Sequence, residues 1–234
     1  MPKRQKPLQI DLLTIFPEAC LPYLEASILG RAQKNKLVSF AAHQLRKWTH
    51  DNHNTVDDRP FGGGAGMVMK IEPFHEALTE LGIVTKKGKK TASAKKTRVI
   101  LTSAKGKFFT QADAKRLSKY DRLIFLCGRY EGIDERVTTH LVDEELSIGP
   151  FVLTGGELPA LVMADAVTRL RPGVLGKEAS LDEESWSDEQ TSEYPQFTRP
   201  ESYLGWDVPE VLMSGDHKKI KEWRKSQRHP KKEN

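Results

Sequence analysis

The chain has 234 residues, 38% of them hydrophobic, so it is long enough for one ordinary domain with a sizeable core and a small second domain. No apolar run approaches the roughly 20 residues needed to span a bilayer, and the N-terminal segment lacks the apolar core of a secretory signal. We therefore expect a cytoplasmic protein with no membrane role. Two cysteines, Cys20 and Cys127, are too few for a disulfide framework and lack metal-ligand spacing.

The net charge of +5 is strongly segregated along the chain. Thr85–Thr97 carries six lysines and no acid, His217–Asn234 carries eight Lys or Arg against two Glu, and Glu178–Glu193 carries seven acids and no base. Two basic segments are the pattern expected of a protein that binds a polyanion such as nucleic acid. For Thr85–Thr97, a disordered loop that only aids solubility is an equally good interpretation. For the C-terminal segment we favour function, because Ile220 and Trp223 give it an apolar edge that can pack or stack.

Strand and helix patterns alternate from the first residues of the chain. This alternation predicts an α/β fold with a mainly parallel sheet. The last predicted helix has apolar residues on more than one side, so we expect it to be buried on several sides, one of them in a subunit interface. In chain order, the predicted elements are a strand over Leu8–Phe16, a helix from Pro17 toward Lys34, a strand over Leu37–Ala42, a helix over Pro73–Leu81, a strand over Arg98–Ser103, a helix over Thr110–Ser118, a strand over Leu123–Cys127 and a helix over Glu157–Leu170.

Two apolar patterns lead directly into glycine-bearing loops. Leu123–Cys127 has the continuous apolar character of a strand buried on both faces, and it stops at Gly128. A second buried-strand pattern, Ile148–Leu153, leads into Gly155 and Gly156. Ligands bind at the carboxyl ends of strands in open α/β sheets, so the two loops suggest one shared pocket. A pair of tight turns is the alternative, and composition alone favours it.

Six blocks of the sequence carry a more specific signal than any single glycine pattern. The blocks are TVDDRPFGGGAGM (Thr55–Met67), LCGRYEGIDERV (Leu126–Val137), SIGPFVLTGGELPAL (Ser147–Leu161), RPGVLGKEAS (Arg171–Ser180), FTRPE (Phe197–Glu201) and VLMSGDH (Val211–His217). With these blocks in the family's order, the chain resembles the bacterial tRNA (guanine-N1)-methyltransferases of the SPOUT class over nearly its whole length.

The resemblance implies a SPOUT-type knotted α/β domain and a homodimer whose active sites lie at the interface. It also implies S-adenosylmethionine as methyl donor and, in tRNA, the N1 nitrogen of the guanosine immediately 3′ of the anticodon as acceptor. Magnesium dependence is a further expectation, although no Asp, Glu or His cluster has metal-ligand spacing. The domains implied are a knotted S-adenosylmethionine-binding methyltransferase domain over 1–175, an acidic linker over 176–193, and a short, basic, helical tRNA-binding module over 194–234.

The same resemblance assigns candidate site residues. Gly66, Asp165 and Arg169 match positions at the substrate. Backbone groups of the cofactor-binding segments contact adenine and ribose in the family, while apolar side chains enclose the ring. The matching cofactor-binding positions are Leu101, Thr102, Ser103, Gly128, Arg129, Tyr130, Glu131, Ile148, Gly149, Pro150, Phe151, Val152, Leu153, Gly155, Gly156 and Pro159.

Methylation of guanine N1 requires a general base and a cation that stabilises charge developing on O6. Glu184 matches the position of the family's aspartate base, although its side chain is longer by one methylene group. If the alignment to the family shifts by one or two residues, Asp182 or Glu183 is the base instead. Arg169 matches the family's essential arginine. The ordinary alternatives are a solvated linker charge for the acid and an i,i+4 pair with Asp165 for the arginine.

A competing interpretation is an RNA-binding or ribosome-associated protein of the same fold with weak or lost catalysis. Glu184 and the short C-terminal segment motivate it. A knotted methyltransferase that acts on another RNA is a third interpretation, which the FTRPE block and the linker disfavour.

Overall fold

A computed structural model describes residues 6–175 and 193–228 of the chain. The residues form two compact units, Met1–Gly176 and Lys177–Asn234, and each is considered by itself. Across these described residues, none of the helices has both the length and the apolar character needed to traverse a bilayer.

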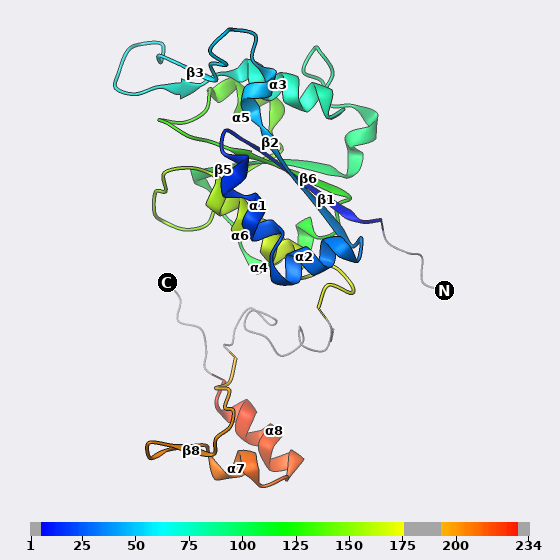
Figure 1. Ribbon diagram of the computed structural model, residues 1–234, viewed down its shortest axis with the longest axis vertical. Helices are drawn as coiled ribbons and strands as arrows, with labels where there is room; N and C mark the ends of the chain where they lie inside the picture. The colour runs from blue at the N-terminus through cyan, green and yellow to red at the C-terminus, as the bar shows by residue number, and fades with distance from the viewer. Residues whose placement is uncertain (1–5, 176–192, 229–234) are drawn as a thin grey trace. The chain divides into compact units, whose positions relative to one another are not determined.

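The first unit is built on a five-stranded sheet in the order β2-β1-β6-β5-β7 (Figure 1). Every neighbouring pair in this sheet is parallel, as the alternation of strands and helices predicted. The central strand is β6, whose residues Leu123 to Cys127 are fully buried. The strands are β1 (Leu8–Thr14), β2 (Val38–Gln44), β5 (Thr97–Phe108), β6 (Arg122–Cys127) and β7 (Glu144–Ser147), with a separate short pair, β3 (Asp57–Asp58) and β4 (Val68–Met69).

Helices cover both faces of the sheet (Figure 1). One apolar cluster contains Leu12 and Phe125 of the sheet together with residues of α2, α4 and α6. The other contains Ile124 and Leu101 together with residues of α3 and α5. Successive residues of a strand therefore pack into opposite clusters, because side chains alternate between the two faces of a strand. The helices are α1 (Leu21–Leu24), α2 (Ser27–Lys34), α3 (Ile71–Glu80), α4 (Gln111–Leu117), α5 (Glu135–Leu141) and α6 (Glu157–Thr168), with 3-10 turns η1 (Pro17–Ala19), η2 (Leu45–Trp48) and η3 (Ala92–Lys96).

The helix expected from Pro17 toward Lys34 is interrupted. The structure divides this segment into η1, α1 and α2. Pro22 lies in the first turn of α1, where its missing N–H is harmless, but inside one continuous helix it would remove a hydrogen bond. Ser27, the first residue of α2, has a positive φ of 44°, which interrupts the helical backbone a second time.

The second apolar pattern is not a buried strand. The strand that precedes the second glycine loop is β7, which ends at Ser147. Phe151 and Val152 instead lie in the following loop, where 51% and 84% of their surface is exposed. A short apolar run has the same appearance in sequence whether it enters a sheet or lines a ligand or subunit surface, which explains the error.

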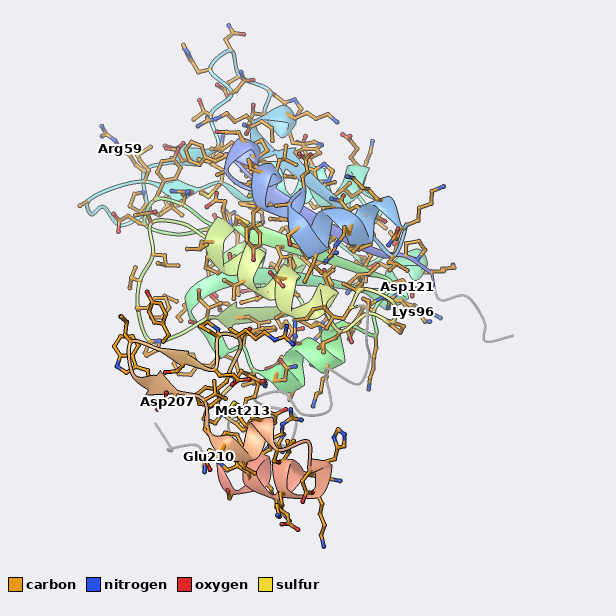
Figure 2. The ribbon with its side chains drawn as sticks, turned by 60° about the horizontal axis from the view of Figure 1, so that its bottom comes forward. Arg59, Lys96, Asp121, Asp207, Glu210 and Met213 are labelled. Atoms are coloured by element: carbon orange, nitrogen blue, oxygen red, sulfur yellow. The ribbon has the colours of Figure 1, made fainter. Side chains whose placement is uncertain are left out.

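The lysine-rich segment lies at the amino ends of the strands. Lys90 Nζ contacts a carboxylate oxygen of Asp143 at 2.6 Å, and the same carboxylate accepts a 2.8 Å hydrogen bond from the backbone N–H of Val99 in β5. The Asp121 N–H donates to the Lys96 carbonyl at 3.0 Å, and the two residues lie together in Figure 2. This segment is therefore attached to the edge of the sheet opposite the carboxyl ends of β5 and β6.

The second unit contains a short hairpin and two helices. Its described part has no residue in the most buried class, and Trp206 exposes 72% of its surface. Asp216 caps the last helix by accepting hydrogen bonds from the N–H groups of Lys218 and Lys219 at 3.1 Å. The elements are β8 (Ser202–Tyr203), β9 (Trp206–Asp207), α7 (Glu210–Met213) and α8 (His217–Ser226).

Candidate active site

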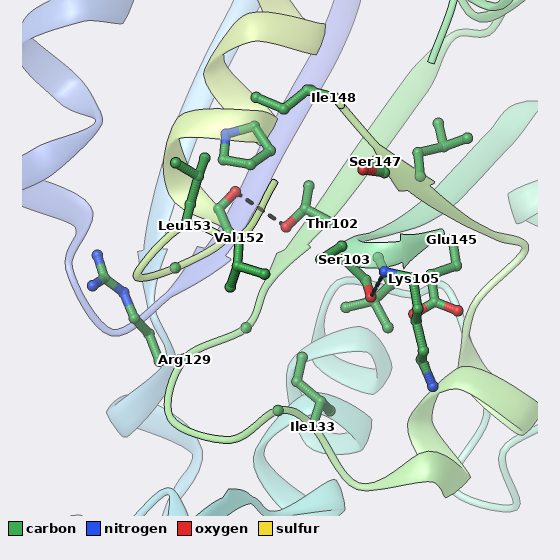
Figure 3. A pocket seen from close by; sticks show the side chains of 18 of the residues that line it. Thr102, Ser103, Lys105, Arg129, Ile133, Glu145, Ser147, Ile148, Val152 and Leu153 are labelled. Atoms are coloured by element: carbon green, nitrogen blue, oxygen red, sulfur yellow. Dashed lines mark hydrogen bonds and ion pairs between the residues drawn. The ribbon is translucent and has the colours of Figure 1, made fainter. Parts of the chain in front are cut away.

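A cavity of about 400 Å³ opens at the carboxyl ends of β5, β6 and β7 (Figure 3). This is the edge of the sheet at which the strand-end rule predicts a ligand. All the predicted cofactor positions line the cavity except Gly149 and Pro150. Those that line it are Leu101, Thr102, Ser103, Gly128, Arg129, Tyr130, Glu131, Ile148, Phe151, Val152, Leu153, Gly155, Gly156 and Pro159.

A bulge in β5 opens one wall of the cavity. The pairing of β5 with β7 shifts register between Thr102 and Lys107, so the intervening residues leave the ladder. Gly106 permits this path, because a Cβ at that position would lie 2.7 Å from the carbonyl oxygen of Glu145 and from the Leu146 nitrogen. The bulge directs Ser103 and Lys105 toward the mouth of the cavity (Figure 3).

The two glycine loops are bonded to each other and to β5. Thr102 Oγ1 donates to the carbonyl of Gly156 at 3.1 Å and also lies 3.1 Å from the Leu126 carbonyl. The Gly156 N–H donates to the Gly128 carbonyl at 2.9 Å. A Cβ on Gly156 would lie 2.9 Å from both Cys127 Cα and the Gly128 nitrogen, so only glycine allows this approach. The back of the cavity is therefore fixed by backbone contacts between segments distant in sequence.

A buried carboxylate joins these loops to the end of β1. Glu157, 4% exposed at the start of α6, accepts a 2.6 Å hydrogen bond from Thr14 Oγ1 and a 3.0 Å hydrogen bond from Arg129 Nε. The Arg129 guanidinium also donates to the Thr154 carbonyl at 3.2 Å and lies 4.7 Å from the centre of the Phe16 ring. An acid in the first turn is favoured by the helix dipole, and here it is also paired. No sequence pattern indicated that Glu157 would bond both Thr14 and Arg129.

Both cysteines lie near this network, and neither is suited to nucleophilic chemistry. Burial, and secondarily the charge of Glu157, raises the pKa of Cys20 to about 11. The same two causes, with burial again the larger, raise the pKa of the fully buried Cys127 thiol well above its usual value. Neutral thiols are poor nucleophiles, so the chemistry of this site has to come from other residues.

The glycine-rich arm, residues 59–67, approaches the cavity from the β3–β4 pair. The Glu131 N–H donates to the Met67 carbonyl at 3.0 Å. Gly66 has a φ of +78°, and a Cβ on it would collide with the Glu131 side chain. The structure thus places Gly66 beside a residue that lines the cavity, although Gly66 does not itself line it.

Several lining residues were not among the predicted positions. Ile133 directly follows Gly132 in the first glycine loop, so that loop could have pointed to it, whereas Thr138 lies on α5, which contains no glycine. Glu145 lies on β7, and its Oε1 is a buried acceptor without a hydrogen bond, 4.0 Å from Lys105 Nζ. Applying the strand-end rule to β7 would have identified Glu145 and Ser147.

The predicted substrate residues on α6 lie away from this cavity. The helix begins at the cavity with Glu157, and a rise of 1.5 Å per residue places Arg169 roughly 18 Å farther along its axis. Asp165 accepts a hydrogen bond from the Tyr23 hydroxyl, which raises the pKa of that tyrosine, and neither Asp165 nor Arg169 lines the cavity. Glu184, the predicted base, lies outside the described residues, as do Asp182 and Glu183.

Comparisons with known proteins extend over almost the whole chain. The model of the family "tRNA (Guanine-1)-methyltransferase TrmD" matches residues 8–234. The tRNA (guanine-N(1)-)-methyltransferase of Bacillus subtilis is 51% identical over 217 residues, which cover 93% of this chain and 86% of the relative. Proteins with the same description from Heliobacterium modesticaldum and Carboxydothermus hydrogenoformans are 49% and 50% identical, covering 94% of this chain and 80% and 82% of those relatives.

Proposed function

The chain belongs to the tRNA (guanine-1)-methyltransferase family, and we propose that its cavity holds S-adenosylmethionine for methylation of the guanosine immediately 3′ of the tRNA anticodon. Membership of this family implies S-adenosylmethionine as methyl donor and tRNA as substrate. The observation that carries the proposal is the cavity at the carboxyl edge of the sheet, where three segments matching the family's cofactor motifs converge.

The lining of the cavity fits this cofactor. Its volume of about 400 Å³ lies in the roughly 300–1,000 Å³ range of small-molecule sites. Leu101, Ile133 and Ile148 offer apolar surface to an adenine ring, and the glycine backbone permits close approach. Glu131 and Glu145 are acids suited to a ligand that carries positive charge. When bound, S-adenosylmethionine supplies an electrophilic methyl group on a sulfonium.

Protein residues have two tasks in this reaction. A carboxylate removes the proton from guanine N1, and we assign this task to Glu184 on the basis of its matching position in the family. A cation stabilises the negative charge that spreads to O6, and we assign this task to Arg169. The residues that line the cavity would orient the cofactor so that its methyl group faces the acceptor nitrogen.

Replacing Glu184 with glutamine is expected to lower the single-turnover rate of methyl transfer by about 10²- to 10³-fold, because the N1 proton loses its acceptor. Glu184→Asp restores the residue type found in the family and should keep activity within about tenfold of wild type. Asp182→Asn and Glu183→Gln are the matched controls. A rate loss in one of these and not in Glu184→Gln would move the base to that position.

An exposed stripe on α6 supports a homodimer. Leu158, Val162, Asp165 and Arg169 follow one another at helical spacing, and the two apolar members expose 56% and 43% of their surface. A two-fold interface pairs the same surface with itself, so two copies of α6 would cross with opposite directions. The end of one helix would then approach the start of the other. In this arrangement, Arg169 of the second copy approaches the cavity of the first copy. Arg169 of the first copy does not reach that cavity.

Val162→Glu is expected to convert the dimer into a folded monomer without methyltransferase activity, because it buries two uncompensated charges at the interface. Light scattering coupled to gel filtration measures the mass, and circular dichroism checks the fold. Leu204→Glu, at an exposed apolar residue of the second unit, is the control and should leave the dimer intact. A Val162→Glu protein that stays dimeric and active would contradict this interface.

A magnesium requirement remains an expectation from the family resemblance, and no step of the reaction is assigned to a metal here. Within residues 6–175 and 193–228, no group of three or more His, Cys, Asp or Glu side chains is arranged to hold a metal ion.

The function is tested by incubating the protein with S-adenosylmethionine and unmodified tRNA and mapping the product by mass spectrometry. We expect one added methyl group, on N1 of the guanosine that follows the anticodon. Methylation of a different nucleotide would change the substrate position. Cofactor binding without any product would instead favour an RNA-binding protein that has lost catalysis.

A further inference from the structure

The second unit contains a cavity of its own. It has a volume of about 410 Å³ and lies between α7, α8 and the segment that precedes the β8–β9 hairpin. Its apolar floor includes Met213, which Figure 2 labels, and Ile220. None of the described residues of this unit is in the most buried class, so its aromatic side chains keep accessible surface.

Aromatic rings and arginines form the walls of this cavity. Phe197 and Trp223 lie with ring centres 6.3 Å apart and planes tilted by 57°. The guanidinium carbon of Arg224 lies 4.9 Å from the centre of the Tyr194 ring. Ile220, Trp223 and Arg224 share one face of α8 because they are spaced i, i+3 and i+4. Phe197 still exposes 47% of its surface, so a flat ligand can reach it.

Charge around the cavity favours an anionic ligand. Helix α8 carries five Lys or Arg residues and one Glu. Arg199 and Arg224 both line the cavity, and one acid, Glu201, lines it as well. A flat apolar group attached to an anion meets the aromatic walls and the arginines together. In RNA, that combination is a base with its phosphate.

We propose that this cavity binds one unstacked nucleotide of the tRNA, its base against Phe197 and Trp223 and its phosphate near Arg199 or Arg224. The inference rests on the proposed function, because it takes tRNA as the ligand. It adds a nucleotide site distinct from the methyl-transfer cavity, lined entirely by residues 194–224. The acid Glu201 is placed to accept a hydrogen bond from a base N–H, which gives the site a means of preferring one base.

Two tryptophans of the same unit provide a matched test. Trp223 lines the cavity, whereas Trp206 lies on the hairpin and does not. Trp223→Ala should raise the KM for tRNA roughly 5- to 150-fold, the loss of one stacked base, with kcat at saturating tRNA and the Kd for S-adenosylmethionine unchanged. Trp206→Ala should leave all three at wild-type values. Trp223→Phe keeps a stacking ring and should recover most of the affinity.

Tryptophan fluorescence separates base stacking from a merely structural role. Trp186, which is close in sequence to Glu184, is first replaced with phenylalanine so that it does not contribute to the signal. In this background, adding tRNA should quench the emission of the protein and of its Trp206→Phe variant, and the quenching should be largely lost in Trp223→Phe. Equal KM values for Trp223→Ala and wild type would overturn the proposal. So would equal losses in both alanine variants, or quenching that persists in Trp223→Phe. A wild-type protein that methylates no tRNA would instead overturn the proposed function.

Discussion

Replacing Arg169 with alanine is expected to lower the single-turnover rate of methyl transfer by about 10²- to 10³-fold, the usual effect of removing one group that stabilises an oxyanion. The affinity for S-adenosylmethionine should be unchanged, because the role assigned to Arg169 is to stabilise charge on guanine O6 and not to bind the cofactor. Rapid quench with labelled cofactor measures the rate, and calorimetry measures the affinity. Methylation within a few-fold of wild type would show that the catalytic assignment is wrong.

Arg171 is the matched control for this variant. Arg171 is 5% exposed, and its guanidinium donates hydrogen bonds to the backbone carbonyls of Ser118, at 2.8 Å, and Lys6. Burial lowers the pKa of Arg171 from its ordinary value. Arg171→Ala leaves these carbonyls without their donor, so it should lower the free energy of unfolding by about 1–3 kcal/mol. The rate per folded molecule should change little, in contrast to Arg169→Ala.

Mixing experiments decide which chain supplies Arg169. Ile148→Trp is designed to fill the cavity, so it and Arg169→Ala should each be inactive alone. Unfolding and refolding an equimolar mixture should produce mixed dimers with one complete site, about a quarter of the wild-type number of sites. If Arg169 acted within its own chain, the mixture would stay inactive.

Gly156→Ala should have the largest effect of any small substitution at the cavity. Its Cβ would lie within 3 Å of backbone atoms of Cys127 and Gly128, which are the last residue of the central strand and the residue after it, so these atoms cannot move aside easily. We expect a loss of about 1–3 kcal/mol or more in the free energy of unfolding. The Kd for S-adenosylmethionine should rise at least about tenfold, since the back of the cavity would shift. Denaturant unfolding and calorimetry measure the two effects.

Gly155 offers the control next to it in sequence. The three atoms nearest to a Cβ on Gly155 all belong to the Arg129 side chain, which can shift more readily than backbone atoms, at the cost of its hydrogen bonds to Glu157 and Thr154. Gly155→Ala should therefore be milder than Gly156→Ala in both stability and cofactor affinity. Equal effects of the two variants would mean that the backbone contact at Gly156 is not what fixes the cavity.

Four strands of the central sheet, β1, β2, β5 and β6, could be predicted from sequence because their signals are local, whereas β7 was not predicted. Leu123–Cys127 is apolar at every position, and only a strand covered on both faces buries such a run in so short a length. The glycine loops that follow the strands were also visible, since glycine at a strand end is a strong signal. Pro22 was visible too, and its position could have corrected the single long helix that we expected.

The rest of the site depends on tertiary contacts that spacing cannot encode. Glu157 reads as an ordinary first-turn acid, yet its partners Thr14 and Arg129 are distant in sequence. Nor does spacing along a helix say which copy of the chain a side chain serves. Asp165 and Arg169 are spaced i,i+4 in sequence, and that spacing indicates neither the hydrogen bond from Tyr23 to Asp165 nor the absence of both residues from the cavity lining of their own chain.

The attachment of the lysine-rich segment at the amino ends of the strands has a practical consequence. Lys90 is bonded to Asp143, and Lys96 is bonded through its backbone to Asp121, so the segment stays on that edge. Arg59, on the glycine-rich arm, lies at the other end of the first unit in Figure 2. Residues 86–89 are thus a suitable place to graft an epitope or fluorophore for immobilising the enzyme with its catalytic edge unobstructed.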